Sequence, residues 1–207
     1  NMIKPITTLF MIMSVDGKIS TGCTDDRDVD KDFPHIEGIS NGLSQYYDIE
    51  KTTDLFSMNS GRVMAKMGVN SPKKDIKKIP VSFIIIDNKP HLTDVGVDYF
   101  INMSKDFFLV TTNKNHPAFQ RENEKNLHII YYFEQINFSD LFSKLKETYK
   151  IEQMTIQTGG TLNSILLREK LIDKLSIVVA PALIGGKDTS SLIDGNSLKE
   201  DDELEYI

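Results

Sequence analysis

The sequence is poor in cysteine, tryptophan and arginine. Its 207 residues include one cysteine, no tryptophan and four arginines, and the net charge is −6. A lone cysteine, Cys23, excludes an internal disulfide and a cysteine-rich zinc site. A negative chain with so few arginines lacks the clustered positive charge of a nucleic-acid or anionic-membrane surface, so neither partner is expected.

Long apolar runs are also missing. The run from Leu9 to Met13 is too short to span a membrane, and it reaches Asp16 too soon for a signal peptide with a cleavage site. We therefore expect a cytoplasmic protein. The histidines have no paired spacing that suits a metal, so no metal site is predicted, and we expect each of them on the surface or in a loop. They are His35, His91, His116 and His128.

Three common motifs do not occur. No G-x-G-x-x-G follows a predicted strand, and there is no G-x-x-x-x-G-K-[ST], which argues against Rossmann and P-loop nucleotide sites. There is also no G-x-S-x-G elbow for a serine nucleophile. Any nucleotide must bind by a different route.

The remaining composition is that of a globular protein. Hydrophobic residues make up 40% and charged residues 26% of the chain, and the length suits one α/β domain over residues 1–207. Apolar, β-rich runs predict seven strands. These runs are Thr7–Met13, Leu55–Met58, Val81–Ile86, Phe107–Val110, Leu127–Tyr132, Met154–Gln157 and Leu175–Val179.

Helical patterns lie between the predicted strands. The clearest is Phe138–Tyr149, with an apolar stripe and Asn137 as a possible N-cap, and Met64–Met67 and Val95–Met103 predict shorter helices. Alternation of strands and helices predicts a mainly parallel mixed sheet with helices on both faces, a three-layer α/β sandwich. Thr21–Gly42 and the lysine-rich Ser71–Pro80 are expected to be irregular connections.

The segment Thr155–Gly195 is the most informative. A short strand leads into Gly159-Gly160, where the backbone can pass close to a ligand, and Thr161 could cap the following helix. The first N–H groups of that helix could bind an anion. An ordinary tight turn between a strand and a helix is the alternative.

Two blocks of sequence resemble one enzyme family. Gly159–Asn163, Leu171–Leu175 and Ala180–Gly186 are similar to the C-terminal signature of the riboflavin-biosynthesis pyrimidine reductases, and Met13–Ile19 resembles their N-terminal signature. The resemblance implies a dihydrofolate-reductase-like fold and an NADPH-dependent oxidoreductase that reduces a phosphorylated ribosylaminopyrimidine to the ribitylamino product. Such reductases are often fused to a zinc deaminase with a Pro-Cys-x-x-Cys motif. One cysteine cannot supply that motif, so a stand-alone reductase is expected.

The resemblance also implies a set of site residues. Asp16 could donate or accept a proton, or bind a pyrimidine edge, although a turn-forming aspartate would look the same. The residues expected at the substrate are Ser14, Lys18 and Thr158. The residues expected at NADPH are Gly17, Ile19, Gly61, Arg62, Val63, Thr111, Thr112, Lys114, Gly159, Gly160, Thr161 and Leu162. A cis or distorted Gly159–Gly160 peptide is implied as well.

The sequence departs from the family at two positions on the substrate side. Thr158 stands where family members have an acidic residue, and the segment Gly38–Asp54 has no arginine for a substrate phosphate. Two alternatives therefore stay open: a reductase of a pterin or other heterocycle, and a nucleotide-binding protein without chemistry. The family usually ends in a β-hairpin, whereas this sequence stops near Leu204–Ile207, where such a strand would begin. An incomplete hairpin would leave an uncovered sheet edge, and members of the family commonly pair through their sheets, so the resemblance implies a homodimer.

Overall fold

The computed structural model describes residues 2–207, which form two compact units. The middle unit comprises Asp54–Gln157 with the residues up to Pro5, and the flanking unit comprises Ile6–Thr53 and Thr158–Ile207. Each unit has its own parallel strands. The expectation that residues 1–207 form a single domain stays a prediction.

The middle unit contains a five-stranded sheet. Its strands are β2 Phe56–Ser60, β3 Ser82–Ile86, β4 Phe107–Thr111, β5 Leu127–Tyr131 and β6 Gln153–Ile156. They are ordered β5-β4-β3-β2-β6, and every pair is parallel. Parallel strands end at the same edge, so the residues that follow β2, β3 and β4 are brought close together.

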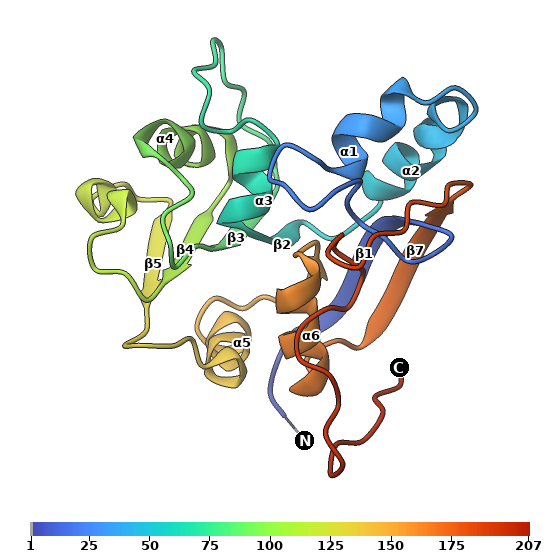
Figure 1. Ribbon diagram of the computed structural model, residues 1–207. Helices are drawn as coiled ribbons and strands as arrows, with labels where there is room; N and C mark the ends of the chain where they lie inside the picture. The colour runs from blue at the N-terminus through green and yellow to red at the C-terminus, as the bar shows by residue number, and fades with distance from the viewer. Residues whose placement is uncertain (1) are drawn as a thin grey trace. The chain divides into compact units, whose positions relative to one another are not determined.

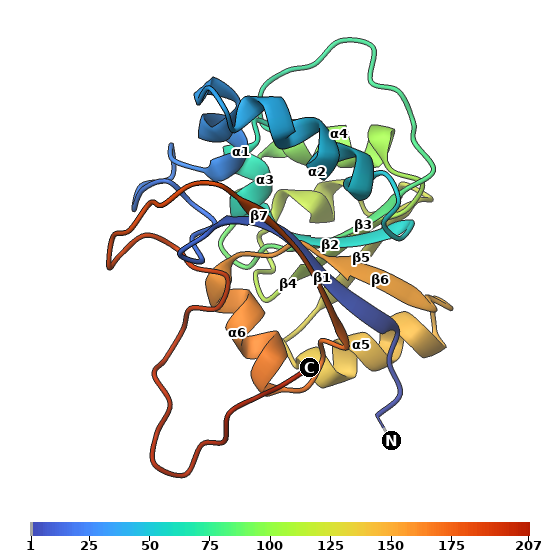
Figure 2. The ribbon, with the colours of Figure 1, turned by 90° about the vertical axis from the view of Figure 1, so that its right-hand side faces the viewer.

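Helices connect these strands and cover both faces of the sheet (Figure 2). They are α3 Gly61–Lys66, α4 Asp94–Met103, α5 Phe138–Glu147 and the short 3₁₀ helix η3 Pro117–Arg121. Phe100 of α4 packs against Phe107 of β4, with ring centroids 5.2 Å apart, in a buried cluster that also contains Ile85. Each fully buried side chain of this size contributes about 1.5–3 kcal/mol to folding.

The flanking unit is built on β1 Ile6–Ser14, which pairs in parallel with β7 Lys174–Ala180. One face of the pair is covered by α1 Val29–Asp32 and α2 Leu43–Glu50, and α6 Gly160–Arg168 lies on the other side (Figures 1 and 2). Two 3₁₀ turns, Phe33–His35 and Ser40–Gly42, connect α1 to α2. Phe10 of β1 stacks on Tyr46 of α2 at 5.2 Å, which anchors these small helices to the strands.

The α/β fold is confirmed, and all seven predicted strands are present within about two residues of their expected ends. The predicted α4 and α5 helices are confirmed, and Asn137 caps α5 by accepting the Asp140 N–H at 3.0 Å. Three details differ. α3 begins at Gly61, three residues earlier than predicted. α2 was not predicted, and the short helix α1 lies within Thr21–Gly42, which was expected to be irregular. No helix within residues 2–207 is long and apolar enough to cross a membrane.

Candidate functional site

The turn after β1 holds the first group of predicted site residues. Gly17 has φ +80°, a left-handed conformation that favours glycine, and its N–H donates to the Ser14 carbonyl at 3.0 Å. The Ser14 hydroxyl donates to Asp16 Oδ1 at 2.5 Å and accepts the Lys18 N–H at 2.9 Å. This network fixes Asp16 and Lys18 on a rigid turn.

Asp16 binds the backbone of a second turn. Its carboxylate accepts the Ile184 N–H at 3.1 Å and the Gly185 N–H at 2.6 Å. These bonds, with the hydroxyl of Ser14 as the largest cause, lower the pKa of Asp16 to about 2. Asp16 is therefore ionised at neutral pH and is a hydrogen-bond acceptor, not a proton donor.

Lys18 contacts the same C-terminal loop. Its ammonium donates to the carbonyls of Gly186 at 2.7 Å and Thr189 at 2.9 Å. Ile19 is buried, and its N–H donates to the Ser190 carbonyl at 2.9 Å. The turn after β1 and the loop Ile184–Ser191 thus form one connected structure. Among the described residues, the segment after β7 forms an isolated antiparallel bridge between Ser191 and Lys18, but it forms no strand that pairs with β7.

Two of the predicted substrate ligands are enclosed by the protein. Ser14 and Thr158 have no exposed surface, and the Thr158 hydroxyl donates to Asn163 Oδ1 at 2.5 Å. Asn163 in turn donates to the Leu192 carbonyl at 2.9 Å. The Thr158 hydroxyl thus belongs to a hydrogen-bond chain that connects α6 to the C-terminal loop. Its role at a substrate stays a prediction.

The Gly159–Gly160 turn opens α6, but the expected cap is wrong. The N-cap is Gly159, and Thr161 lies inside the first turn of the helix as an exposed residue. The helix can begin earlier because Gly160, its first residue, has no side chain that would overlap Asp194 and Ser191. Of the implied cis or distorted Gly159–Gly160 peptide, the cis form is wrong, since no peptide bond among the described residues is cis. A distorted peptide stays a prediction.

Gly160 is buried beneath the C-terminal loop. A methyl group on its Cα would overlap Asp194 Oδ2 and the Ser191 carbonyl oxygen. The Asp194 N–H also donates to the Gly160 carbonyl at 3.0 Å. The first N–H groups of α6, including those of Thr161 and half-buried Leu162, have no acceptor within the helix, which leaves them suited to an anion.

In the middle unit, Gly61-Arg62-Val63 form the start of α3. Ser60 caps this helix by accepting the Val63 N–H at 3.2 Å. Gly61 is buried, and a methyl group there would overlap the carboxylate of Asp87. Arg62 is exposed. The glycine is therefore required by close packing at the carboxyl end of β3.

The polar residues after β4 form a tight turn. Thr111 is fully buried, and its hydroxyl oxygen accepts the Asn113 N–H at 3.0 Å. The Thr112 N–H donates to Asn88 Oδ1 at 3.0 Å. Lys114 is exposed at the tip of the turn, 5.6 Å from the Tyr131 ring centroid in a cation–π contact.

His116 was expected on the surface or in a loop; it lies in the loop before η3, but that loop position is buried. It is 1% exposed, and its Nε2 lies 2.8 Å from Oδ2 of Asp87, which is 2% exposed. Asp87 also accepts the N–H groups of His91 and Leu92 at 3.1 Å. Sequence reasoning missed this pair because its members are 29 residues apart.

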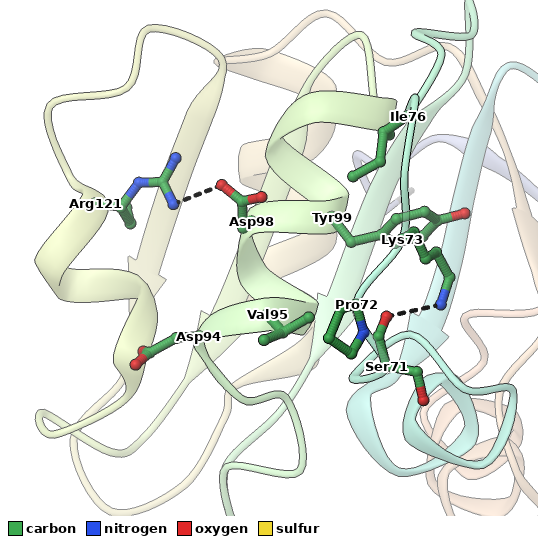
Figure 3. A pocket seen from close by; sticks show the side chains of 9 residues that line it. All are labelled: Ser71, Pro72, Lys73, Ile76, Asp94, Val95, Asp98, Tyr99 and Arg121. Carbon is green, nitrogen blue, oxygen red and sulfur yellow. Dashed lines mark hydrogen bonds and ion pairs between the residues drawn. The ribbon is translucent and has the colours of Figure 1, made fainter.

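A pocket of about 410 Å³ in the middle unit lies apart from all predicted site residues (Figure 3). It is lined by Ser71, Pro72, Lys73, Ile76, Asp94, Val95, Asp98, Tyr99 and Arg121. Arg121 donates to Asp98 at 2.9 Å, and Lys73 donates to the Ser71 carbonyl at 3.1 Å. Its main cations are thus already paired within the protein. We also find no group of three or more potential metal ligands among residues 2–207.

Comparison with known proteins identifies the family. Residues 5–206 match the family described as the RibD C-terminal domain. The chain belongs to this family. The resemblance inferred from the two signatures is thereby confirmed.

Individual relatives support the same assignment. A 2,5-diamino-6-ribosylamino-4(3H)-pyrimidinone 5′-phosphate reductase from Methanothermobacter thermautotrophicus is 36% identical over 50 residues, which are 24% of this chain and 23% of the relative. The match thus spans about a quarter of that relative's length.

Solved structures share the fold at low identity. RibD from Acinetobacter baumannii is 16% identical with a TM-score of 0.63, and the match covers 97% of this chain and 52% of that chain. The riboflavin biosynthesis reductase Rib7 from Saccharomyces cerevisiae is 20% identical with a TM-score of 0.61, and the match covers 97% and 84%. These likenesses confirm the dihydrofolate-reductase-like α/β fold.

Proposed function

We propose that this protein is an NADPH-dependent reductase that converts the ribosylamino group of a phosphorylated pyrimidine to a ribitylamino group in riboflavin biosynthesis. The observation that carries this proposal is the family match across residues 5–206. The curated relative, which is named a pyrimidinone 5′-phosphate reductase, supports the substrate class.

The residues present fit a dinucleotide phosphate. The start of α6 offers N–H groups that have no acceptor within the helix, and Lys114 offers an exposed cation on the turn after β4. The open position is at Gly159, where a side chain would meet no atom within 4 Å, whereas Gly160 packs against Asp194 and Ser191. In this proposal, the start of α6 at Gly159–Leu162 holds the pyrophosphate. For the middle unit, the resemblance implies Gly61–Val63 beneath the cofactor, with Arg62 at a phosphate, and Thr111, Thr112 and Lys114 at the adenosine ribose and its 2′-phosphate.

NADPH supplies a hydride when bound. The protein's own contribution on the substrate side is then positioning. Asp16 is ionised and fixed by Ser14, Ile184 and Gly185, so it can accept a hydrogen bond from a pyrimidine N–H group but cannot donate a proton at neutral pH. We assign proton delivery to solvent or to the substrate's own groups.

A homodimer and a cytoplasmic location complete the proposal. β7 lies at the end of the strand pair in the flanking unit, and Leu175 and Val179 on it are 48% and 53% exposed. An exposed apolar strand edge favours a partner. Light scattering that gives the monomer mass of 23.5 kDa at all concentrations would contradict the dimer.

Turnover measurements test the function. Purified protein is mixed with NADPH and, separately, with the phosphorylated ribosylaminopyrimidine, its dephosphorylated form, dihydropterin and dihydrofolate, and the loss of NADPH absorbance is followed. We expect oxidation of NADPH only with the ribosylaminopyrimidines. Binding of NADPH without turnover on any compound would favour a nucleotide-binding protein without chemistry.

A reductase of another heterocycle is the second candidate. It is favoured by Lys18, whose ammonium is bound to the loop carbonyls of Gly186 and Thr189, and by the lack of arginine in Gly38–Asp54. Both features leave few cations for a substrate phosphate. Faster turnover with a pterin than with either ribosylaminopyrimidine would select this candidate.

A further inference from the structure

Asp87 is a buried carboxylate at the carboxyl end of the parallel strands of the middle unit. It lies directly after β3, and its carboxylate accepts two backbone N–H groups of the following loop, from His91 and Leu92. Its Oδ1 also lies where a side chain on Gly61 would be, and Oδ2 is 2.8 Å from His116 Nε2. One carboxylate thus contacts three segments of the chain.

His116 has a defined protonation pattern. Its Nδ1 accepts the Ala118 N–H at 3.0 Å, which caps η3, so Nδ1 bears no proton. The ring proton of the neutral imidazole then lies on Nε2 and is donated to Asp87. Because both side chains are almost fully buried, loss of Asp87 would leave the Nε2 donor of His116 without a partner, and loss of His116 would remove one of the donors to the buried carboxylate.

The turn between β4 and η3 is held at both ends by hydrogen bonds to two adjacent residues of another segment, Asp87 and Asn88. Thr112 N–H binds Asn88 Oδ1 at 3.0 Å at one end, and His116 binds Asp87 at the other. Lys114 lies at the tip between these anchors. Its backbone position therefore depends on Asp87 and Asn88, which are not part of its own turn.

We propose that Asp87 and His116 are positioning residues that hold the Thr112–His116 turn, and with it Lys114, in place for the adenosine 2′-phosphate of NADPH. This inference rests on the proposed function, because it takes Lys114 as a ligand of that phosphate. It adds a source of preference for NADPH over NADH that acts through buried residues without touching the cofactor. A long lysine on a loose turn would lose more entropy on binding than one on a fixed turn.

Two substitutions of His116 separate its two hydrogen bonds. His116→Gln keeps an N–H donor near the position of Nε2 but loses the cap at Nδ1. His116→Asn keeps an acceptor near Nδ1 but loses the donor to Asp87. Asn88→Ala removes the other anchor from an exposed position and so serves as the variant that keeps the core intact.

Isothermal titration of each variant with NADPH and with NADH tests the proposal. We expect His116→Asn and Asn88→Ala to bind NADPH about tenfold more weakly, with little change for NADH, and His116→Gln to keep the wild-type preference. A purely structural role would instead lower the melting temperature and leave the ratio of the two dissociation constants unchanged.

Two failures can be told apart. Wild-type protein without a preference for NADPH overturns the proposed cofactor and this inference with it. Wild-type protein that prefers NADPH, with the same preference in His116→Asn and Asn88→Ala, overturns this inference alone. If His116→Asn does not fold, Asp87→Asn takes its place, because the neutral amide weakens the bond to His116 Nε2. An unchanged ratio of the two dissociation constants in that variant overturns this inference.

Discussion

The Cα of Gly160 packs against the carboxylate of Asp194, so closely that a methyl group on Gly160 would overlap Oδ2. Asp194 cannot easily move away, because both of its carboxylate oxygens accept the Ser191 N–H at 3.1 Å. The glycine pair at the start of α6 is therefore asymmetric: Gly160 is required by packing, whereas a methyl group on Gly159 would meet no atom within 4 Å.

This asymmetry predicts different effects of two alanine substitutions. Gly160→Ala should lower the free energy of unfolding by about 1–3 kcal/mol, because overpacking displaces the Ser191–Asp194 loop. Gly159→Ala should be nearly neutral. Alanine is a poorer N-cap residue than glycine, but it also lowers the conformational entropy of the unfolded chain, and these two effects of about 0.5–1 kcal/mol each offset one another. Urea denaturation of both variants measures the difference, and equal losses would contradict the packing argument.

Asp16→Asn should reduce turnover per folded molecule while changing NADPH affinity little. The amide replaces an ionised acceptor of the Ile184 and Gly185 N–H groups with a neutral one, so the loop beside the turn is held less firmly. Turnover and melting temperature are measured on the same preparation. Asp26→Asn is the matched control, because Asp26 is an exposed loop carboxylate that accepts a bond from Thr24. Undiminished turnover would remove Asp16 from the active site.

The lowered pKa of Asp16 also predicts an acid-dependent stability difference. Its folded-state pKa is about 2 and its ordinary value is 3.8, so its contribution to stability is present above pH 3.8 and is lost as the pH falls toward 2. The difference in melting temperature between the wild type and Asp16→Asn should therefore be constant near neutrality and shrink in that acid range. A difference that changes instead between pH 6 and 8, a range set by the ordinary pKa of histidine at about 6.5, would point to another group.

Asp30→Asn should stabilise the protein above neutral pH. Burial, and then the charges of Asp28 and Glu50, raise the pKa of Asp30 to about 7. The folded state thus binds a proton that the unfolded state releases near pH 3.8, and stability decreases as the pH rises from 3.8 to about 7. We expect a gain of about 1–4 kcal/mol at pH 8 and little gain at pH 4, since a tenfold change in proton affinity corresponds to about 1.4 kcal/mol.

Thermal unfolding across this pH range checks the Asp30 prediction. Asp48→Asn is the control, because its side chain is 73% exposed on the same pair of helices. An Asp30→Asn variant that is less stable than the wild type at pH 8 would show that the ionised carboxylate has a stabilising partner.

Lys114→Gln should weaken NADPH binding by about tenfold to a hundredfold and leave NADH binding nearly unchanged, because one charge-assisted contact is worth about 1.5–3 kcal/mol. Titration at a single ionic strength compares the two cofactors. Lys125→Gln is the control, since Lys125 is an exposed lysine outside the predicted site. Equal dissociation constants for NADPH and NADH in the wild type would contradict the expected cofactor preference.

The strands could be predicted because each is a short apolar run, and buried parallel strands need no alternation of polar residues. The helix α2 could not be predicted, because only Leu43 and Tyr46 of its eight residues are buried. Two buried apolar positions are too few to show a helical period in the sequence. The start of α6 was misplaced by about two residues, since a threonine after two glycines is a good cap in isolation while the glycines themselves adopt the helix start.

The candidate site was less predictable than the fold. The glycines and the Asp16 turn follow from local sequence, but their partners do not. The buried state of His116 depends on Asp87, and the close packing of Gly160 depends on Asp194. A single sequence contains no signal for such distant pairs, and a histidine before a proline has the local appearance of a surface loop.

The bond between Asp16 and Gly185 joins residues 169 positions apart. During synthesis, β1 and its turn leave the ribosome well before their partners, β7 and the Ile184–Gly186 loop. The middle unit has all of its strands available before then. Nascent chains that expose residues up to Ile156 outside the ribosome, but not yet β7, should therefore protect the middle unit from proteolysis while leaving the turn at Asp16 accessible, so this protein gains its substrate-side turn last.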